Sequence, residues 1–307
     1  MAKPPSRIHR GLVGQRELVG TTYLADTGLR REYEQEIAPR TVAALERIFA
    51  RQTQLAPRRV LDVGAGTGAA SSVIRTRWPE AEVVAVDRVA GPGIVRADVT
   101  RGLRPAGVVG TFDLLVAAHL LNELPLDLDG RARLVLGWCR EMLADEGVVV
   151  LVEPALRETS RALLGVRDRL LAAGLFVEAP CLWQGPCPAL ARDRDFCHAS
   201  AHALMHGRSR VDFSYLVVRK QGIAQSDPAL FRIVSDAMKD KGRLRRFGCG
   251  PAGRLLMTRL DRDRESSNAL FDEVERGDVI RIVGATAQSD GLRCGRDCTV
   301  ARVDVGF

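Results

Sequence analysis

Three glycines at alternate positions form the first group of residues whose type and spacing could do chemistry. Gly64, Gly66 and Gly68 follow a short apolar run, and a helical pattern begins directly after them. Glycine permits a tight turn and lets the backbone approach a ligand closely. A loop of this kind between a strand and a helix predicts a cofactor site, and the alternative is the same turn without a cofactor.

Acidic residues near this loop match the polar groups of one cofactor. Asp87 ends the next apolar run, and its carboxylate can accept hydrogen bonds from both hydroxyls of a ribose. Asp98 can accept a hydrogen bond from the amino group of an adenine, and Asp62 suits the amino-acid end of a cofactor that has one. The GxGxG spacing differs from the GxGxxG of dinucleotide sites, so the pattern favours S-adenosylmethionine. The residues predicted to contact it are Asp62, Gly64, Ala65, Gly66, Gly68, Asp87, Arg88, Asp98, Val99 and His119.

The segment after the fourth apolar run is where a substrate-facing group is expected. Its polar residues are His119, Asn122 and Glu123, and it lacks the Asn-Pro-Pro-Tyr type of motif that accompanies methylation of a base amine. His119 is a candidate general base, or equally a hydrogen-bonded structural histidine. Cys139 lies in a predicted helix and is expected in the core. No catalytic residue is therefore assigned.

Four cysteines form a second candidate site. Cys181, Cys187 and Cys197 have the spacing C-x5-C-x9-C in a segment rich in Pro, and Cys249 follows later. Thiolates are soft ligands, and four of them suit a tetrahedral zinc ion or an iron–sulfur cluster. The remaining alternative is a set of buried free thiols.

The last cysteine pair is ambiguous. Cys294 and Cys298 form a C-x3-C pair that could supply ligands, form a redox pair, or be two thiols on a turn. The N-terminal residues resemble no secretory signal, so a reducing compartment is expected. The cysteines are then predicted to be thiols or metal ligands and not a disulfide framework.

Apolar runs that alternate with helical patterns must position these groups. The rhythm predicts an α/β fold, a doubly wound Rossmann-like sheet with helices on both faces. Residues 200–206 and 228–239 are predicted to be helical. The expected organisation is a disordered basic tail (1–20), N-terminal helices (21–55), a cofactor-binding domain (56–220) with a Cys-rich insert (178–200), and a small β-rich module (221–307).

Charge indicates the class of partner. The 307 residues include 45 Lys and Arg against 38 Asp and Glu, which gives a formal net charge of +7. Excess positive charge favours polyanions, because Lys and Arg release counterions from phosphates. No apolar run is long enough to cross a bilayer, so no membrane partner is expected.

Two resemblances sharpen these predictions. The motifs "LDVGAGTG", "VVAVD", "RADVT" and "FDLLVAAHLLNEL" resemble class I methyltransferases. The insert "PC…PCP…FCH", the strand "FSYLVVRK" and the later "CGPAGRL" resemble the mitochondrial small-ribosomal-subunit methyltransferase-like family, which also has bacterial members.

The second resemblance implies a specific cofactor and partner. It implies a [4Fe–4S] cluster held by Cys181, Cys187, Cys197 and Cys249, and binding to small-subunit ribosomal RNA during ribosome assembly, with or without methylation of that RNA. It implies the cytoplasm of a bacterium, or the mitochondrial matrix of a eukaryote. The alternative function is a small-molecule or protein methyltransferase with a structural zinc site. The oligomeric state is not predicted.

Overall fold

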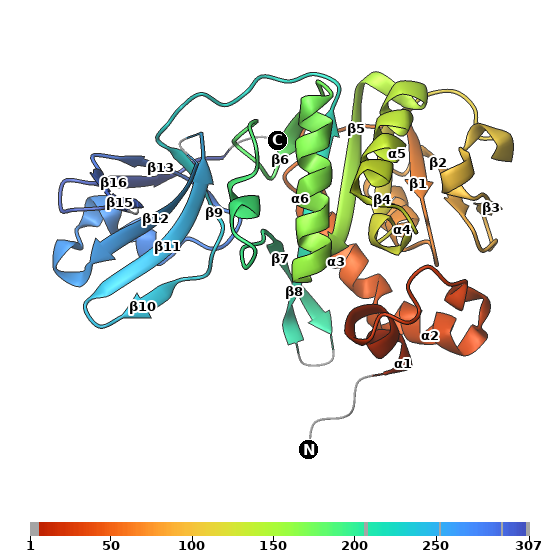
Figure 1. The fold of residues 1–307 in the computed structure, drawn as a ribbon, viewed down its shortest axis with the longest axis horizontal. Helices are drawn as coiled ribbons and strands as arrows, with labels where there is room; N and C mark the ends of the chain where they lie inside the picture. Colours follow the sequence, from red (N-terminus) through yellow and green to blue (C-terminus); the bar gives the residue numbers. More distant parts are fainter. Residues whose placement is uncertain (1–5, 206–207, 252, 290, 305–307) are drawn as a thin grey trace.

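The computed structural model describes residues 6–205, 208–251, 253–289 and 291–304. Within these residues the chain forms two eight-stranded sheets, one after the other along the sequence. Figure 1 shows the first sheet and its helices at the centre and right and the second sheet on the left, and helix α6 (Arg157–Ala172) packs against β5, β6 and β8 of the first sheet. The two sheets therefore form separate layers of one molecule.

The first sheet has the strand order β3-β2-β1-β4-β5-β8-β6, and β7 pairs with β8. The strands β1 to β5 are parallel to their neighbours, whereas β8 runs antiparallel to β5 and β6. The order reverses between β1 and β4, which is the topological switch point where doubly wound sheets bind ligands. The strands are β1 Arg59–Val63, β2 Glu82–Asp87, β3 Ile94–Arg96, β4 Phe112–Ala118, β5 Leu143–Pro154, β6 Phe176–Ala179, β7 Ala199–Met205 and β8 Arg208–Arg219.

Helices cover both faces of this sheet, which confirms the predicted fold class. On one face Phe49 and Ile74 are fully buried, and on the other Val135 and Leu170 are fully buried. Burial on both faces explains why the central strands are continuous apolar runs. None of the described helices is long and apolar enough to cross a membrane. The helices besides α6 are α1 Arg7–His9, α2 Thr27–Glu36, α3 Ala38–Phe49, α4 Ala69–Arg77 and α5 Leu128–Glu141.

The N-terminal segment differs from the predicted disordered tail. Residues 1–5 lie outside the described part of the chain, but from Ser6 onward the segment is folded against α2. The backbone N–H of Ile8 donates to the Glu32 carboxylate over 2.9 Å, and the Ser6 hydroxyl donates to Glu36 over 2.6 Å. Ile8 is fully buried. The many basic residues made this segment resemble a disordered tail, although the apolar Ile8 is buried against the fold.

The second sheet confirms the predicted β-rich C-terminal module. Its order is β14-β15-β12-β11-β9-β13-β16, with β10 paired to β11. Phe231, Met257 and Phe271 lie in its core. The strands are β9 Leu230–Ile233, β10 Met238–Asp240, β11 Arg243–Gly250, β12 Gly253–Leu260, β13 Val279–Val283, β14 Thr286–Gln288, β15 Gly291–Arg293 and β16 Thr299–Arg302.

Two predicted helices are strands in the structure. β7 occupies most of residues 200–206, although His206 itself lies outside the described residues. The segment 228–239 contains β9 and the first part of β10, with a loop between them. The run Leu230–Ile233 is buried at every position, and a short continuous apolar run does not distinguish a buried strand from a helix. These segments are strands because they hydrogen-bond to other strands, some of which are distant in the sequence.

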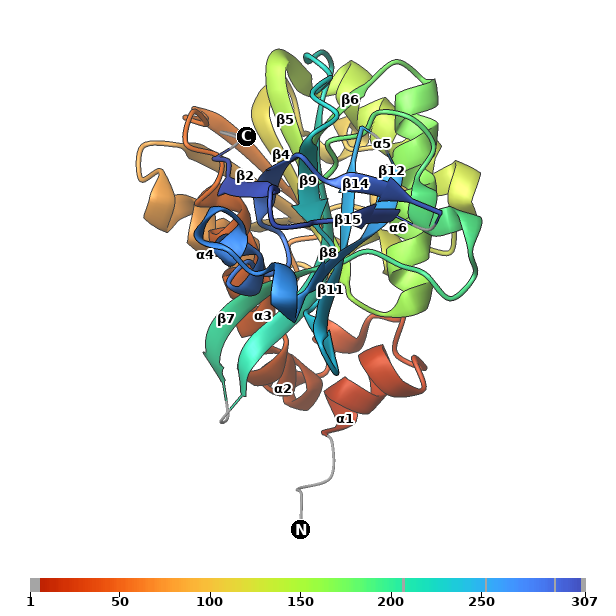
Figure 2. The ribbon, with the colours of Figure 1, turned by 90° about the vertical axis from the view of Figure 1, so that its left-hand side faces the viewer.

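The cysteine-rich insert lies where the two sheets meet. Leu182 of the insert is buried together with Leu230 and Val279 of the second sheet. Asp195 of the insert accepts a hydrogen bond from Arg254 of β12 over 2.5 Å. Figure 2 shows the second sheet in front of the first. The insert therefore connects the two layers.

Candidate functional site

The first candidate site is a partly open cavity at the carboxyl ends of β1, β2 and β4. Doubly wound sheets bind ligands at this edge. Seven of the ten residues predicted to contact the cofactor line the cavity. They are Gly64, Gly66, Asp87, Arg88, Asp98, Val99 and His119. The structure therefore brings most of the predicted contact residues together.

The glycine loop forms one wall of the cavity. Gly64 has φ +74°, which strains any residue with a side chain, and a β-carbon there would lie 2.7 Å from the Leu120 side chain, so Leu120 would have to move. The backbone N–H of Gly66, at φ +59°, donates to Asp87 over 2.9 Å. The loop is thus tied to the end of the neighbouring strand.

The Asp87 carboxylate is held rigidly at the cavity wall. One oxygen accepts from Gly66, and the other accepts from the N–H of Val89 over 2.8 Å. Each carboxylate oxygen retains a lone pair for a further donor. A pair of neighbouring hydroxyls is the ligand group that such a fixed carboxylate accepts.

Three predicted contact residues do not line the cavity. Ala65 and Gly68 are absent from its wall, and Asp62 is buried below the loop, 1% exposed. Asp62 accepts from the backbone N–H and the hydroxyl of Ser71, at 3.0 and 2.6 Å. Burial raises the pKa of Asp62 to about 6. Asp62 therefore fixes the start of α4 and has no direct path to a ligand in this structure.

The N-terminal segment forms a wall that the sequence reasoning missed. Tyr23 and Tyr33 line the cavity, and the Tyr23 hydroxyl donates to the Glu123 carboxylate over 3.1 Å. Arg16 donates to the Asn122 side chain over 3.1 Å. The two sides of the cavity are thus joined by polar contacts between residues about 100 positions apart in the sequence.

His119 lies on the cavity wall without a partner for its ring. Its backbone is left-handed, with φ +59°, and among the described residues neither ring nitrogen has a hydrogen-bond partner. Burial lowers the pKa of His119 to about 4. The ring is therefore neutral near pH 7, and the described residues contain no carboxylate that orients it as in a catalytic triad.

Two glutamates close to His119 in the sequence or the sheet have raised pKa values: Glu123, which lines the cavity, and Glu153, which is buried. Burial raises the pKa of Glu123 to about 7 and that of Glu153 to about 8. Glu153 is 2% exposed, and one of its oxygens accepts from the N–H of Leu121 over 2.9 Å. Its other oxygen has no partner in the described part of the chain, which fits a protonated carboxyl group.

Glu153→Gln is expected to flatten the pH dependence of stability. Because the pKa of Glu153 is about 8 in the folded protein and ordinarily 4.5, the folded state binds more protons between these pH values. The free energy of unfolding therefore falls as the pH rises from about 4.5 to about 8, by at most about 1.4 kcal/mol for each pH unit. Gln stays neutral and keeps an acceptor for Leu121.

The test is urea unfolding at pH 5, 6.5 and 8, with exposed Glu146→Gln as the control. The Glu153 variant should match the unmodified protein at pH 5 and exceed it at pH 8, with a smaller fall remaining from Glu123. Equal falls in the unmodified protein and the Glu153 variant would contradict the assignment.

The second candidate site is a cavity of about 530 Å³ at the junction of the two sheets. Its wall includes the thiols of all four predicted ligands, Cys181, Cys187, Cys197 and Cys249. The structure brings Cys249 of β11 to the insert, and all four thiols are free. Burial raises the pKa of Cys187 to about 11 and that of Cys197 to about 12, and it also raises that of Cys249.

Three arginine side chains lie beside the cysteines of this cavity. The pairing of β11 with β9 and β12 places Cys249 opposite Arg232 on one side and Arg254 on the other. Both line the cavity together with Arg167, and its described wall includes no Asp or Glu. Buried positive charge beside four soft sulfur atoms suits an anionic group bound by thiolates.

The four cysteines line one pocket but do not form a closed single-ion site in this structure. Among the described residues, no three His, Cys, Asp or Glu side chains come close enough to hold a metal ion. Structural zinc requires four ligands that converge within about 2.3 Å of one point.

Cys294 and Cys298 take no part in this site. They form a disulfide in the core of the second sheet, where both are almost fully buried. For this pair, the disulfide corrects the prediction that the cysteines are thiols or metal ligands, whereas the other five cysteines are free. The two cysteines flank a turn, and the fold brings their sulfur atoms together.

Comparison with known proteins identifies the family. The family described as "Mitochondrial small ribosomal subunit Rsm22" matches residues 32–255, which is most of the chain and includes the second cavity and most of the first. The chain belongs to this family. The match extends over the insert and Cys249, so the resemblance read from the sequence is confirmed.

Individual relatives of the chain match over shorter segments. The human "Ribosome assembly protein METTL17, mitochondrial" is 28% identical over 174 residues, which cover 48% of this chain and 37% of that protein. A "Malonyl-[acyl-carrier protein] O-methyltransferase" from Xylella fastidiosa (strain M23) is 59% identical over 32 residues, 10% of this chain and 11% of that protein. The matches thus span well under half of these relatives.

Solved structures with a similar fold include the plantazolicin methyltransferase BpumL in complex with SAH. The two chains are 11% identical, and the similarity covers 70% of this chain and all of that chain with a TM-score of 0.44.

Proposed function

We propose that the protein binds S-adenosylmethionine and a [4Fe–4S] cluster and acts on small-subunit ribosomal RNA during ribosome assembly. The observation that carries the proposal is the cavity at the junction of the two sheets, whose wall contains four free thiols. Family membership supports the ribosomal role, because the matched family is described as a small-ribosomal-subunit family. The proposed location is wherever small subunits are assembled, the bacterial cytoplasm or the mitochondrial matrix.

S-adenosylmethionine is proposed for the cavity beside the glycine loop. That cavity lies at the switch point of the sheet and presents the fixed Asp87 carboxylate together with the Gly64 and Gly66 backbone. Asp98, Val99 and Arg88 also line it. Ala65, Gly68 and Asp62 are proposed to act indirectly, through the shape of the loop and the start of α4.

The cluster is proposed over zinc because the family resemblance implies it and the donor set suits it. Cys181, Cys187, Cys197 and Cys249 are proposed as its ligands. All four line one pocket, and four cysteines with no His, Asp or Glu on the described wall are a typical ligand set for an iron–sulfur cluster. A bound cluster would join the insert to the second sheet through Cys249, and its chemical contribution would be this rigid connection.

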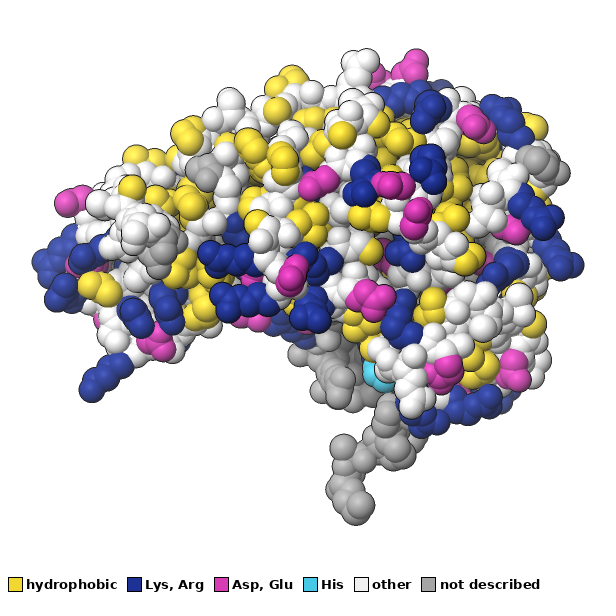
Figure 3. Space-filling view, viewed as in Figure 1, with side chains coloured by type: hydrophobic (Ala, Val, Ile, Leu, Met, Phe, Trp, Pro, Cys, Tyr) yellow, Lys and Arg dark blue, Asp and Glu magenta, His cyan; other side chains and the backbone are white. Residues whose placement is uncertain are grey.

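Ribosomal RNA is proposed as the partner because of the charge and its placement. Figure 3 shows Lys and Arg side chains gathered between the second sheet and α6, over the junction that contains the cysteine cavity. Arg192 and Arg194 of the insert, Lys239 in β10 and Lys241 directly after it are exposed. Contacts of this kind to phosphates position a protein on RNA without reading its sequence.

Replacing Arg192, Arg194, Lys239 and Lys241 with alanine is expected to weaken RNA binding and flatten its salt dependence. Each phosphate contact on a single strand contributes about 0.7 to the slope of log K against log salt, so four lost contacts lower the slope by about 3. The measurement is binding of a small-subunit RNA fragment at several salt concentrations. Alanine at the exposed Arg31, Arg75, Arg133 and Arg157 is the control. An equal effect of both sets would contradict the proposed interface.

The proposal as a whole is tested by sedimentation of tagged protein from its own cells. Association with immature small subunits, mapped by crosslinking to one RNA region, is the expected result. Methyl transfer to a small acid or a protein, with one zinc per chain and no RNA association, would instead establish the alternative function.

A further inference from the structure

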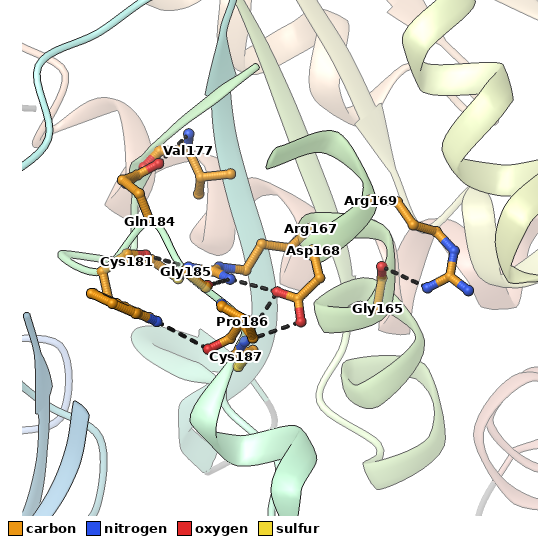
Figure 4. A network of polar contacts seen from close by, with 11 residues as sticks. Gly165, Arg167, Asp168, Arg169, Val177, Cys181, Gln184, Gly185, Pro186 and Cys187 are labelled. Carbon is orange, nitrogen blue, oxygen red and sulfur yellow. Dashed lines mark hydrogen bonds and ion pairs between the residues drawn. The ribbon is translucent and has the colours of Figure 1, made fainter. Parts of the chain in front are cut away.

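An adjacent pair of charged residues on α6 reaches the cysteine loop (Figure 4). The Arg167 side chain is 1% exposed, and its Nε donates to the Cys181 sulfur over 3.1 Å. Its two terminal nitrogens donate to the carbonyl oxygens of Gly185, over 2.8 Å, and Trp183. One guanidinium therefore binds both a proposed ligand sulfur and the backbone that follows it.

Asp168 extends the same network to a second cysteine. Its carboxylate accepts from Arg167 over 2.5 Å, and its two oxygens accept from the backbone N–H of Cys187 at 3.1 and 3.0 Å. Its side chain is 26% exposed, so the pair is open to water only on this side. The ion pair on α6 thus fixes Cys181 through its sulfur and Cys187 through its backbone.

The cost of burying Arg167 indicates what the network is for. A buried guanidinium is strongly unfavourable unless its donors are paired and its charge is balanced. One carboxylate balances it, and its Nε points at a sulfur instead of a second oxygen. A cationic donor on sulfur is most favourable when the sulfur carries negative charge, as a ligand thiolate does.

We propose that Arg167 and Asp168 are positioning residues for the cluster site, and that their opposite charges set its reduction potential in opposite directions. This inference rests on the proposed cluster. Adding one electron makes a thiolate-bound cluster more negative, so a fixed positive charge at a ligand sulfur favours the reduced form. Arg167 therefore raises the potential, and Asp168 lowers it.

The first test is a redox titration of anaerobically purified full-length variants, with dithionite as the one-electron donor. Arg167→Gln is expected to lower the potential and Asp168→Asn to raise it, each by about tenfold in the ratio of oxidised to reduced cluster, or about 59 mV. Arg167→Lys should stay near the unmodified protein because it keeps the charge. Shifts of the same sign in the Gln and Asn variants would overturn the proposal.

The matched control is Arg169→Gln on the same helix. Arg169 bonds Asp129 and the Gly165 carbonyl, on the side away from the cysteines (Figure 4). Its removal is expected to leave the potential unchanged. If Arg167→Gln does not fold, the Asp168→Asn variant, at a partly exposed position, still decides the sign.

A second measurement separates this inference from the proposed function. Hydrogen–deuterium exchange of the 181–187 peptide is recorded in protein from which metal has been removed. Faster exchange in Asp168→Asn than in Arg169→Gln is expected even if the unmodified protein is found to hold zinc. Unchanged exchange in Asp168→Asn would overturn the positioning role whatever the cavity holds.

Discussion

Cys249→Ser is expected to remove the iron from the protein and to loosen the second sheet. Cys249 lies on β11, whereas the other three proposed ligands lie in the insert of the first domain. Serine keeps the size of the side chain but is a poor ligand for iron. Because binding of a structural metal group contributes directly to folding, its loss should also lower the melting temperature by several degrees.

The measurements are iron and sulfide content, thermal unfolding and limited proteolysis. Cleavage is expected between the two sheets, in the exposed residues 221–226, at a higher rate than in the unmodified protein. Cys139→Ala is the control, since this thiol is buried in the core of the first domain and away from the cavity. A Cys249→Ser protein with a full complement of iron would rule out the proposed ligand set.

Asp87→Ala is expected to weaken S-adenosylmethionine binding by about 10- to 100-fold. Hydrogen bonds to a charged group contribute about 1.5–3 kcal/mol, and the variant also releases the Gly66 loop from the end of β2. Calorimetric titration with S-adenosylmethionine and S-adenosylhomocysteine measures the change. Iron content should stay unchanged, because the carboxylate belongs to the other cavity.

Two further variants separate binding from folding. Asp87→Asn keeps an acceptor for Gly66 and should fold like the unmodified protein while still losing affinity. Asp145→Ala removes an exposed carboxylate at the start of β5 and should bind normally. Normal affinity in both Asp87 variants would contradict the proposed cofactor site.

The sequence predicts the first domain well because its signals are local. Alternating apolar runs and helices fix a doubly wound sheet, and the turn chemistry of Gly64 and Gly66 marks the cavity beside it. The pattern does not show which face of the sheet the Asp62 side chain lies on, because a strand residue can point to either face. In the structure Asp62 points toward α4, where it accepts hydrogen bonds from Ser71. The left-handed backbone of His119 also leaves no trace in the pattern.

The features that sequence reasoning misses depend on contacts between distant segments. The N-terminal wall of the cavity depends on Tyr23 meeting Glu123, and the strand β9 depends on pairing with β11 and β13. Spacing and resemblance group the four cysteines, but only the fold shows that Cys249 reaches the insert between two cross-strand arginines. The disulfide between Cys294 and Cys298 likewise follows from the turn that joins β15 to β16.

The central claim is that the cavity between the two sheets holds a cluster that connects them. The most direct test is purification without oxygen, followed by the visible absorption spectrum and assays of iron, sulfide and zinc per chain. A brown protein with about four irons and matching sulfide per chain is the predicted result. A colourless protein with one zinc per chain would contradict the claim.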